Sequence, residues 1–293
     1  VEPQPASALA QPAFDGREIA LTQHSARRMR ELGLWERIEA IEPTAFSPLR
    51  DARILNGPSP FAMVIGHGLS DHGELGWLVS NHLIRRAAWD AVQDSVQRQG
   101  DIQLVTGDGV RQVRIDADRA WVTLESGREC QTRLLVAADS RFSPTRRAVG
   151  IAADLHDFGR SMLVCAMTHD EAHHHAAWEW FDYGQTLALL PMNDDPVSGR
   201  PRSSVVLTLP ATGIDPLMNL PAAAFEAEMA RRFAHRLGSM TLVSTRHAYP
   251  LVAVYPRRLI ATRFACVGDA AVGMHPVTAH GFNFGLLSID ALS

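Results

Sequence analysis

The stretch FACVGDAAVGMHPVTAHGFNFG, residues 264–285, contains the pattern that decides the fold. Its first four residues predict a buried strand, and Gly268-Asp269 then places a carboxylate at the strand's carboxyl end, where open α/β sheets bind ligands. A helix predicted to begin at Gly281 directs free backbone N–H groups and its positive dipole end toward the loop. We interpret this stretch as a niche for a large polar cofactor. The alternative is a structural strand–turn–helix connection.

A second apolar strand ending in an acid lies earlier in the chain. Residues 134–147 read LLVAADSRFSPTRR, so Asp139 follows the apolar run and a Ser/Arg-rich turn comes next. On its own this pattern is as common in structural turns as in binding sites. Paired with Asp269 it predicts two acids at strand ends of one cofactor domain.

The spacing of apolar residues predicts a mixed fold. Helical periodicity covers 21–41, 82–99 and 222–237, while 1–16 is irregular and 43–70 is loop plus strand. A nearly continuous apolar run over 133–138 predicts a buried strand. Period-two alternation predicts further strands over 102–105, 109–115, 120–125, 161–167, 178–183, 186–191, 203–209 and 242–254. The order indicates an α/β (α+β mixed) chain whose cofactor domain is interrupted by a substrate sheet.

Composition limits the function classes. The 293 residues are 46% apolar and 20% charged, and the net charge of -4 gives no basis for a nucleic-acid partner. Three scattered cysteines predict neither a disulfide framework nor a zinc site. Neither a membrane span nor a signal peptide is apparent, so we expect a soluble cytoplasmic protein, with peripheral membrane contact left open.

Four segments match a known family in order. They are GREIAL (16–21), GWLVSNHLIR (76–85), ADS (138–140) and GDAAVGMHPVTAHGFNFG (268–285). On these segments the chain resembles the flavin-dependent aromatic hydroxylases of the para-hydroxybenzoate hydroxylase type, and most closely the ubiquinone-biosynthesis hydroxylases. The resemblance implies an FAD/NAD(P)-binding hydroxylase fold. Its expected domains are an FAD-binding part over 1–70, 77–155 and 242–293, and a mainly β substrate domain over 156–241.

The resemblance also implies which positions contact FAD. Arg17 takes the place of the arginine that reaches the flavin, and Asn81 that of a polar contact at the start of the next helix. Asp139 falls on the Asp-Gly motif, which is tied to both the flavin and the nicotinamide nucleotide. Six residues fall on the Gly-Asp motif that holds the ribityl chain and on the loop over the flavin ring: Gly268, Asp269, Pro276, Gly281, Phe282 and Asn283.

Several positions depart from the family pattern. Ser140 stands where glycine is usual, Val272 where histidine is frequent, and Ala279-His280 where Gly-Gln is common. We expect His280 to influence the substrate, and Met192, in a segment resembling the pocket wall, to touch it. The family's opening strand, G-x-G-x-x-G turn and helix, which hold the pyrophosphate, have no counterpart in these 293 residues. The helices that follow the last motif in the family are likewise expected to be absent. Glu2 takes the place of the ribose-binding acid, so we expect an incomplete βαβ unit.

The implied function is hydroxylation of an aromatic ring with FAD, NAD(P)H and O2, the substrate being a polyprenylated phenol of ubiquinone biosynthesis. Such a substrate would require contact with a membrane surface or a biosynthetic complex. The alternative is a truncated, flavin-poor fragment that serves as a non-catalytic partner-binding module. A reductase or halogenase on the same scaffold ranks lower, because the chain lacks the lysine that a halogenase needs. No catalytic acid or base is assigned. The run His173-His174-His175 is interpreted as a loop rather than a metal site.

Overall fold

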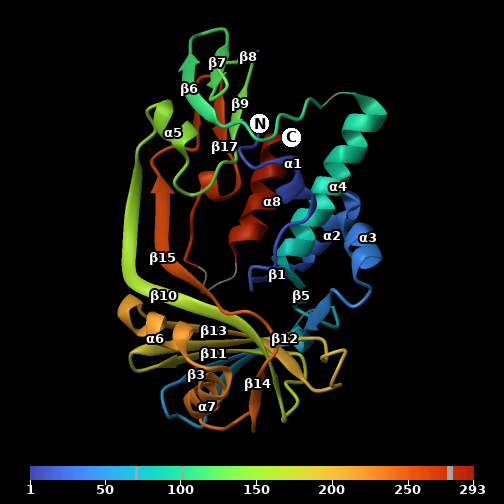
Figure 1. Ribbon diagram of the computed structural model, residues 1–293, viewed down its shortest axis with the longest axis vertical. Helices are drawn as coiled ribbons and strands as arrows, with labels where there is room; N and C mark the ends of the chain where they lie inside the picture. Colours follow the sequence, from blue (N-terminus) through green and yellow to red (C-terminus); the bar gives the residue numbers. More distant parts are fainter. Residues whose placement is uncertain (70–71, 101, 276–279) are drawn as a thin grey trace. The chain divides into compact units, whose positions relative to one another are not determined.

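The computed structural model describes residues 1–69, 72–100, 102–275 and 280–293, and its contacts divide the chain into two compact units (Figure 1). Unit 1 comprises Val1–Pro12, Ala88–Phe158 and Val252–Ser293. Unit 2 comprises Ala13–Ala87 and Gly159–Leu251. Three elements run from one unit into the other: α4 (Asn81–Gln99), β10 (Ala153–His169) and β15 (His247–Pro256).

Unit 2 is built on a mixed sheet of eight strands. Its order is β14-β10-β13-β12-β11-β3-β4, and β15 also pairs with β10. β3 and β11 are parallel, whereas β11, β12 and β13 are joined as antiparallel neighbours. The remaining bounds are β3 (Asp51–Asn56), β4 (Ala62–Gly66), β11 (Ala176–Asp182), β12 (Gln185–Met192), β13 (Arg202–Pro210) and β14 (Met240–Leu242).

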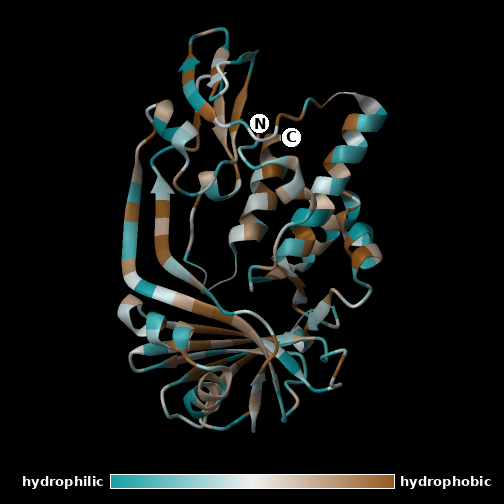
Figure 2. Ribbon diagram, viewed as in Figure 1, coloured by the Kyte–Doolittle hydropathy of each residue, from teal (hydrophilic) through white to brown (hydrophobic). Residues whose placement is uncertain are grey.

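One face of this sheet forms the main core of unit 2. Along β12 buried residues alternate with half-buried ones, because successive side chains of a strand point to opposite faces. The buried set, including Leu187, Leu189 and Leu207, packs against residues of α6 (Ile214–Asn219) and α7 (Ala222–Arg232). In Figure 2 the strands of this sheet carry brown, and therefore apolar, stretches where they cross the lower part of the view.

A smaller sheet and two helices complete unit 2. Its strand order is β1-β5-β2, with β1 at Glu18–Thr22, β5 at Gly76–Ser80 and β2 at Ser47–Leu49. Helices α2 (Gln23–Glu31) and α3 (Leu34–Ile41) follow β1, and the 3-10 turn η1 covers His67–Leu69. Thr22 caps α2 by accepting a hydrogen bond from the backbone N–H of Ser25, and α4 begins directly after β5.

Unit 1 contains the two strands that end in acids. β9 (Leu135–Ala137) and β17 (Phe264–Cys266) pair in parallel, and β16 (Ile260–Ala261) flanks β17. The hairpins β6 (Val110–Ile115), β7 (Ala120–Leu124) and β8 (Glu129–Thr132) form a second sheet. The helical elements are α1 (Ala6–Ala10), α5 (Pro144–Ala148), η3 (Gly268–Ala270) and α8 (Gly281–Leu292).

The expected α/β mixed fold is confirmed, and several element boundaries differ from expectation. The helix expected over 21–41 is a strand and two helices, because Gly33 adopts a left-handed φ of 66° between α2 and α3. The helix expected over 222–237 ends at Arg232, since Ala234 and His235 also have positive φ. The run 133–138 is only partly buried, with β9 at a sheet edge.

Two further differences concern the amino-terminal half. The expected strand over 102–105 is reduced to a bridge between Glu2 and Thr106, and the irregular region 1–16 contains α1. The compact units place 13–87 with 159–251, whereas the cofactor and substrate domains were expected to divide the chain differently. That functional division remains a prediction. Within the described residues, the structure has no helix with the length and apolar character that spanning a bilayer requires.

Candidate functional site

The loop after β17 presents a half-exposed carboxylate. β17 is fully buried, and Asp269 follows it with a side chain that is 45% exposed. The Arg141 guanidinium lies 3.3 Å from Asp269 Oδ2 and also donates a hydrogen bond of 2.9 Å to the carbonyl of Val252. Asp269 therefore stands at the strand's carboxyl end, oriented by one arginine and still accessible to a ligand hydroxyl.

Helix α8 is hydrogen-bonded to this loop, and two glycines at their junction have few close neighbours. The N–H of Gly268 donates to Ser288 Oγ at 3.2 Å, and Ser288 Oγ donates to the carbonyl of Gly285. A Cβ added at Gly268 or Gly281 would meet no atom of the described residues within 4 Å. The side chain of His280, the residue before α8, makes no capping hydrogen bond. Within the described part of the chain the first turn of α8 thus receives no cap from the His280 side chain, and the positive dipole end of the helix suits an anionic group.

The remaining predicted residues of this loop lie close by in the chain. Phe282 and Asn283 belong to the first turn of α8; Phe282 is half-buried and Asn283 is buried. His280 is exposed and its ring lies 5.7 Å from that of Phe284. Pro276 lies outside the described residues.

Asp139 is engaged by its own turn. Its carboxylate accepts hydrogen bonds from Ser143 Oγ at 2.5 Å and from the N–H of Thr145 at 3.0 Å. The buried Arg146 then links this turn to the other loop by donating to the carbonyls of Arg141 (3.1 Å) and Ala270 (2.9 Å). The acid after β9 thus shapes the turn, and Arg146 couples it to the Gly268–Ala270 segment. Contact of Asp139 with a nucleotide stays a prediction.

Ser140, which follows Asp139, has a φ of 96°, a region that favours glycine. A non-glycine residue at this φ strains the folded backbone by about 1–2 kcal/mol. Glycine removes that strain but makes the unfolded chain more flexible, which lowers stability by about 0.5–1 kcal/mol. Ser140→Gly should therefore raise the free energy of unfolding of unit 1 by about 0.5–1 kcal/mol. Urea unfolding midpoints would measure the difference. Ser7→Gly in α1 is the control and should lower stability. A Ser140→Gly protein no more stable than the parent would contradict this prediction.

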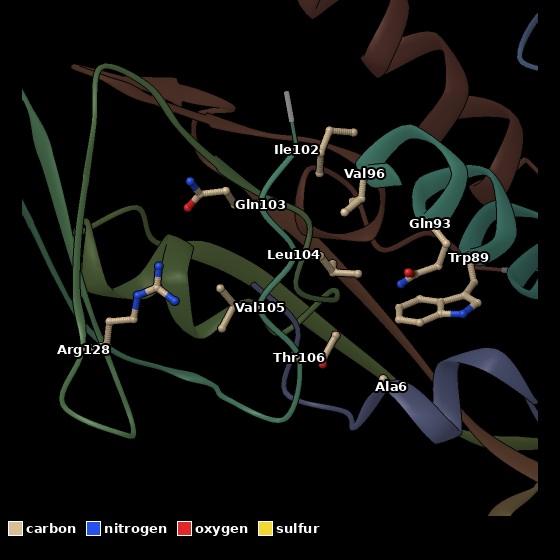
Figure 3. Close-up of a pocket in the computed structure, with 10 residues that line it drawn as sticks. All are labelled: Ala6, Trp89, Gln93, Val96, Ile102, Gln103, Leu104, Val105, Thr106 and Arg128. Carbon is tan, nitrogen blue, oxygen red and sulfur yellow. The ribbon is translucent and has the colours of Figure 1, made fainter. Parts of the chain in front are cut away.

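Glu2 pairs with a residue that lines one of the pockets of unit 1, Thr106. Glu2 bridges to Thr106, and its carboxylate accepts a hydrogen bond of 2.9 Å from the N–H of Gln4. A pocket of about 480 Å3 opens between Trp89, Gln93 and Val96 of α4 and the segment 102–106 (Figure 3). None of the predicted cofactor residues lines it. We therefore assign this pocket no role in the candidate site.

In unit 2 the predicted Arg17 and Asn81 meet at an acid that the sequence analysis missed. Asp15 Oδ2 accepts hydrogen bonds from Arg17 (2.6 Å) and from Asn81 Nδ2 (2.7 Å). The Asn81 N–H donates to the carbonyl of Arg17, and Tyr249 Oη donates to the carbonyl of Asp15. Burial acts to raise the pKa of Asp15, but the hydrogen bonds from Arg17 and Asn81 outweigh it and lower the pKa. The ionised carboxylate fixes both side chains.

A half-buried acid lies next to this group. Glu18 pairs with Ser80 across β1 and β5, and Ser80 Oγ donates to Glu18 Oε1 at 2.5 Å. Burial raises the pKa of Glu18 to about 7, against the opposing effect of the Ser80 hydrogen bond. Glu18 therefore titrates near neutrality, one residue from Arg17.

The histidine run supports the end of β12. The His173 Nε2 lies 3.0 Å from the carbonyl of Met192, and His173 Nδ1 accepts from the N–H of His175 at 3.0 Å. Both ring nitrogens of His173 are therefore in use, with Nε2 as the donor. This arrangement holds Met192, the predicted substrate contact, by its backbone at the end of its strand.

Burial lowers the pKa of His173 from an ordinary value near 6.5 to about 4. As the pH falls, His173 is protonated in the unfolded chain before it is protonated in the folded protein. The contribution of neutral His173 to the free energy of unfolding should therefore be fully present above pH 6.5, and the free energy should fall by about 3 kcal/mol as the pH drops to 4. Chemical unfolding of the parent and of His173→Gln between pH 4 and 7.5 would isolate this contribution. His174→Gln, at the exposed neighbouring residue, is the control, and its free energy of unfolding should change with pH as that of the parent does. Equal slopes for the parent and His173→Gln would contradict the assignment.

Three residues of the site escaped the sequence analysis as contacts: Asp15, Arg141 and Arg146. Asp15 belongs to an Asp-Gly pair directly before Arg17, a turn signal that could have drawn attention to it. Arg141 and Arg146 lie in the Ser/Arg-rich turn, but their partners, Asp269 and the carbonyl of Ala270, are more than 120 positions away.

A family model described as "FAD binding domain" matches residues 8–292. The chain is 43% identical over its whole length to the ubiquinone hydroxylase UbiM of Neisseria meningitidis, covering 62% of that protein. It is 32% identical over 98% of its length to the ubiquinone hydroxylase UbiL of Rhodospirillum rubrum, covering 63% of it. The chain thus spans about three fifths of the length of these curated relatives.

Solved structures agree with the fold. Pseudomonas aeruginosa PqsL in complex with 2-aminobenzoylacetate aligns with a TM-score of 0.74 at 18% identity, over 97% of this chain and 76% of that one. Klebsiella pneumoniae HpxO complexed with FAD and uric acid aligns with a TM-score of 0.68 at 20% identity, over 96% of this chain and 74% of that one. At these identities the likeness shows the fold alone.

Proposed function

The chain belongs to the FAD binding domain family, and from that premise we propose that it is the flavin-binding and substrate-binding part of a monooxygenase that hydroxylates the aromatic ring of a ubiquinone precursor. The single observation that carries the proposal is the 43% identity to a ubiquinone hydroxylase across the whole chain. The substrate would be a phenol with a prenyl tail, reached from a membrane surface or a biosynthetic complex.

The residues of unit 1 fit the ribityl and ring portions of FAD. Asp269 offers a half-exposed carboxylate for ribityl hydroxyls, and the positive dipole end of α8 favours an anionic ring edge. Among the described residues no atom lies within 4 Å of a Cβ added at Gly268 or Gly281, so a flat group could lie against the backbone there. Phe282 and Asn283 would border it. Asp139 and Glu2, whose carboxylates are hydrogen-bonded within their own turns, fit a supporting role better than a direct one.

Unit 2 would supply Arg17 and Asn81 as polar contacts held by Asp15, together with the sheet that receives the substrate. Bound FAD supplies two-electron transfer from NAD(P)H and activation of O2. The protein's own residues bind and orient the cofactor and the ring and keep water away from them.

The visible spectrum of the purified protein tests this proposal. We expect a yellow protein, or one that takes up added FAD to about one per chain, and oxidation of NAD(P)H that a prenylated phenol stimulates. A colourless protein that binds no added FAD would reject the catalytic proposal for this chain and favour a partner-binding module. NAD(P)H oxidation that no phenol stimulates would instead indicate a reductase.

A further inference from the structure

The mixed sheet of unit 2 has a second face that α6 and α7 do not cover. The core residues Leu187 and Leu189 of β12 point toward those helices, so Ala188, Leu190 and Met192 lie on the opposite face. These positions are half-buried rather than buried. The strand register shows which residues of the neighbouring strands share this face.

One row across this second face is apolar except for a single carboxyl group. In register, Glu179 of β11 lies between Ala188 of β12 and Ile54 of β3. The row continues to Val206 beyond Ala188, and to Met63 beyond Ile54. Two strands away on either side, the neighbours of Glu179 are therefore still aliphatic.

The same face also exposes large apolar side chains around this row. Met63 is 60% exposed, Ile65 is 42% exposed and Phe181 is 43% exposed. Phe181 lies two residues after Glu179 on β11, and Ile65 two residues after Met63 on β4, so all of them point to one side. Several large apolar side chains thus stand on the same face as the carboxyl group.

Glu179 has no hydrogen-bond or ion-pair partner among the residues that the structure describes, and burial alone raises its pKa to about 7. The flanking positions on the same face, Thr186 and Leu190 on β12 and Ala52 and Asn56 on β3, carry no charge. Two arginines share this face at a distance from Glu179: Arg202, paired with Met192 at the far end of β12, and Arg160 of β10, paired with Pro210 at the end of β13. Arg202 lies roughly 13 Å from Glu179 along the strands and about 10 Å across them, and Arg160 roughly 13 Å along them in the other direction and about 14 Å across them.

A carboxyl group in apolar surroundings is costly unless a donor satisfies it. We propose that Glu179 is a positioning residue that accepts a hydrogen bond from the ring hydroxyl of a phenolic substrate lying on this face. The apolar part of that substrate lies over Ile54 and Met63. This assignment rests on the proposed function and specifies its substrate contact: the phenol hydroxyl satisfies the carboxylate, and the aliphatic row receives the hydrocarbon.

Paired ligands that differ by one proton donor test the assignment. The full chain is dialysed against 4-hexylphenol and against 4-hexylanisole, its methyl ether, at pH 8, where the Glu179 carboxylate is mostly ionised. The parent should bind the phenol at least about tenfold more tightly, because only the phenol donates to a charged acceptor. Glu179→Leu should abolish this preference while keeping or improving the affinity for the ether. Glu179→Gln, which retains an amide acceptor, should show an intermediate preference.

Glu171→Leu, the same chemical change at an exposed position outside the sheet, is the control and should keep the parent's preference. Equal affinities of the parent for the two ligands, or a preference that survives in Glu179→Leu, would overturn the assignment. So would a variant that weakens both ligands by the same factor, because that result indicates a structural role. If Glu179→Leu does not fold, Glu179→Gln provides the test: a preference for the phenol that is weaker than the parent's supports the assignment, and an unchanged preference overturns it. Dialysis requires neither FAD nor turnover, so failure of the monooxygenase proposal would be seen separately.

Discussion

Gly76→Ala is expected to destabilise unit 2 by roughly 3–5 kcal/mol, the range of the most damaging single substitutions. A Cβ at Gly76 would lie 2.0 Å from the carbonyl oxygen of Leu21 and 3.1 Å from its carbonyl carbon. Both are backbone atoms of the paired strand β1, so no side-chain rotation relieves the overlap, and β1 and β5 must separate. Thermal and urea unfolding of the purified variant would measure the loss.

Gly73→Ala provides a matched control three residues earlier. A Cβ at Gly73 meets no atom of the described residues within 4 Å, so this variant should be as stable as the parent or slightly more stable. If Gly76→Ala and Gly73→Ala have the same unfolding midpoints, the backbones of β1 and β5 do not approach each other as closely at Gly76 as the structure indicates. The consequence for function is direct, because β1 follows Arg17 and β5 precedes Asn81. Separation of these strands would displace both side chains from Asp15.

Asp269→Ala is expected to weaken FAD binding by about 10- to 100-fold. A carboxylate that accepts hydrogen bonds from ligand hydroxyls contributes about 1.5–3 kcal/mol, and tenfold in affinity corresponds to about 1.4 kcal/mol. The loss of its ion pair with Arg141 should hardly change folding stability, because both side chains are partly exposed. Titration of FAD, followed by flavin fluorescence, would measure the affinity in a protein that is still folded.

The control for Asp269→Ala is Asp154→Ala. Asp154 also forms an exposed ion pair in unit 1, with Arg257, but lies outside the predicted cofactor loop. We expect Asp154→Ala to bind FAD as the parent does. An Asp269→Ala protein with the parent's affinity would show that the Gly268–Ala270 loop does not hold the ribityl chain.

The expectations that depended on local pattern agree well with the structure. Apolar periodicity, together with the turn residues between periodic segments, predicts the strand and acid at Phe264–Asp269. The same signals predict the helix that begins at Gly281 and the alternating strands of the mixed sheet. Thr22 caps α2, as a threonine directly before a helix commonly does. Errors arose where backbone conformation overrides periodicity, as at Gly33, and where a helix ends at residues with positive φ, as at Ala234 and His235.

The sequence alone determined that this is an α/β chain with acids after two strands and a helix N-terminus beside one of them, because these features need only neighbouring residues. Tertiary structure decided what those groups touch. It assigned Asp139 to its own turn, Asp15 to Arg17 and Asn81, and Arg146 to the carbonyl of Ala270. It also placed Glu179 alone among aliphatic side chains, because cross-strand register joins residues more than a hundred positions apart, and no local pattern encodes that pairing.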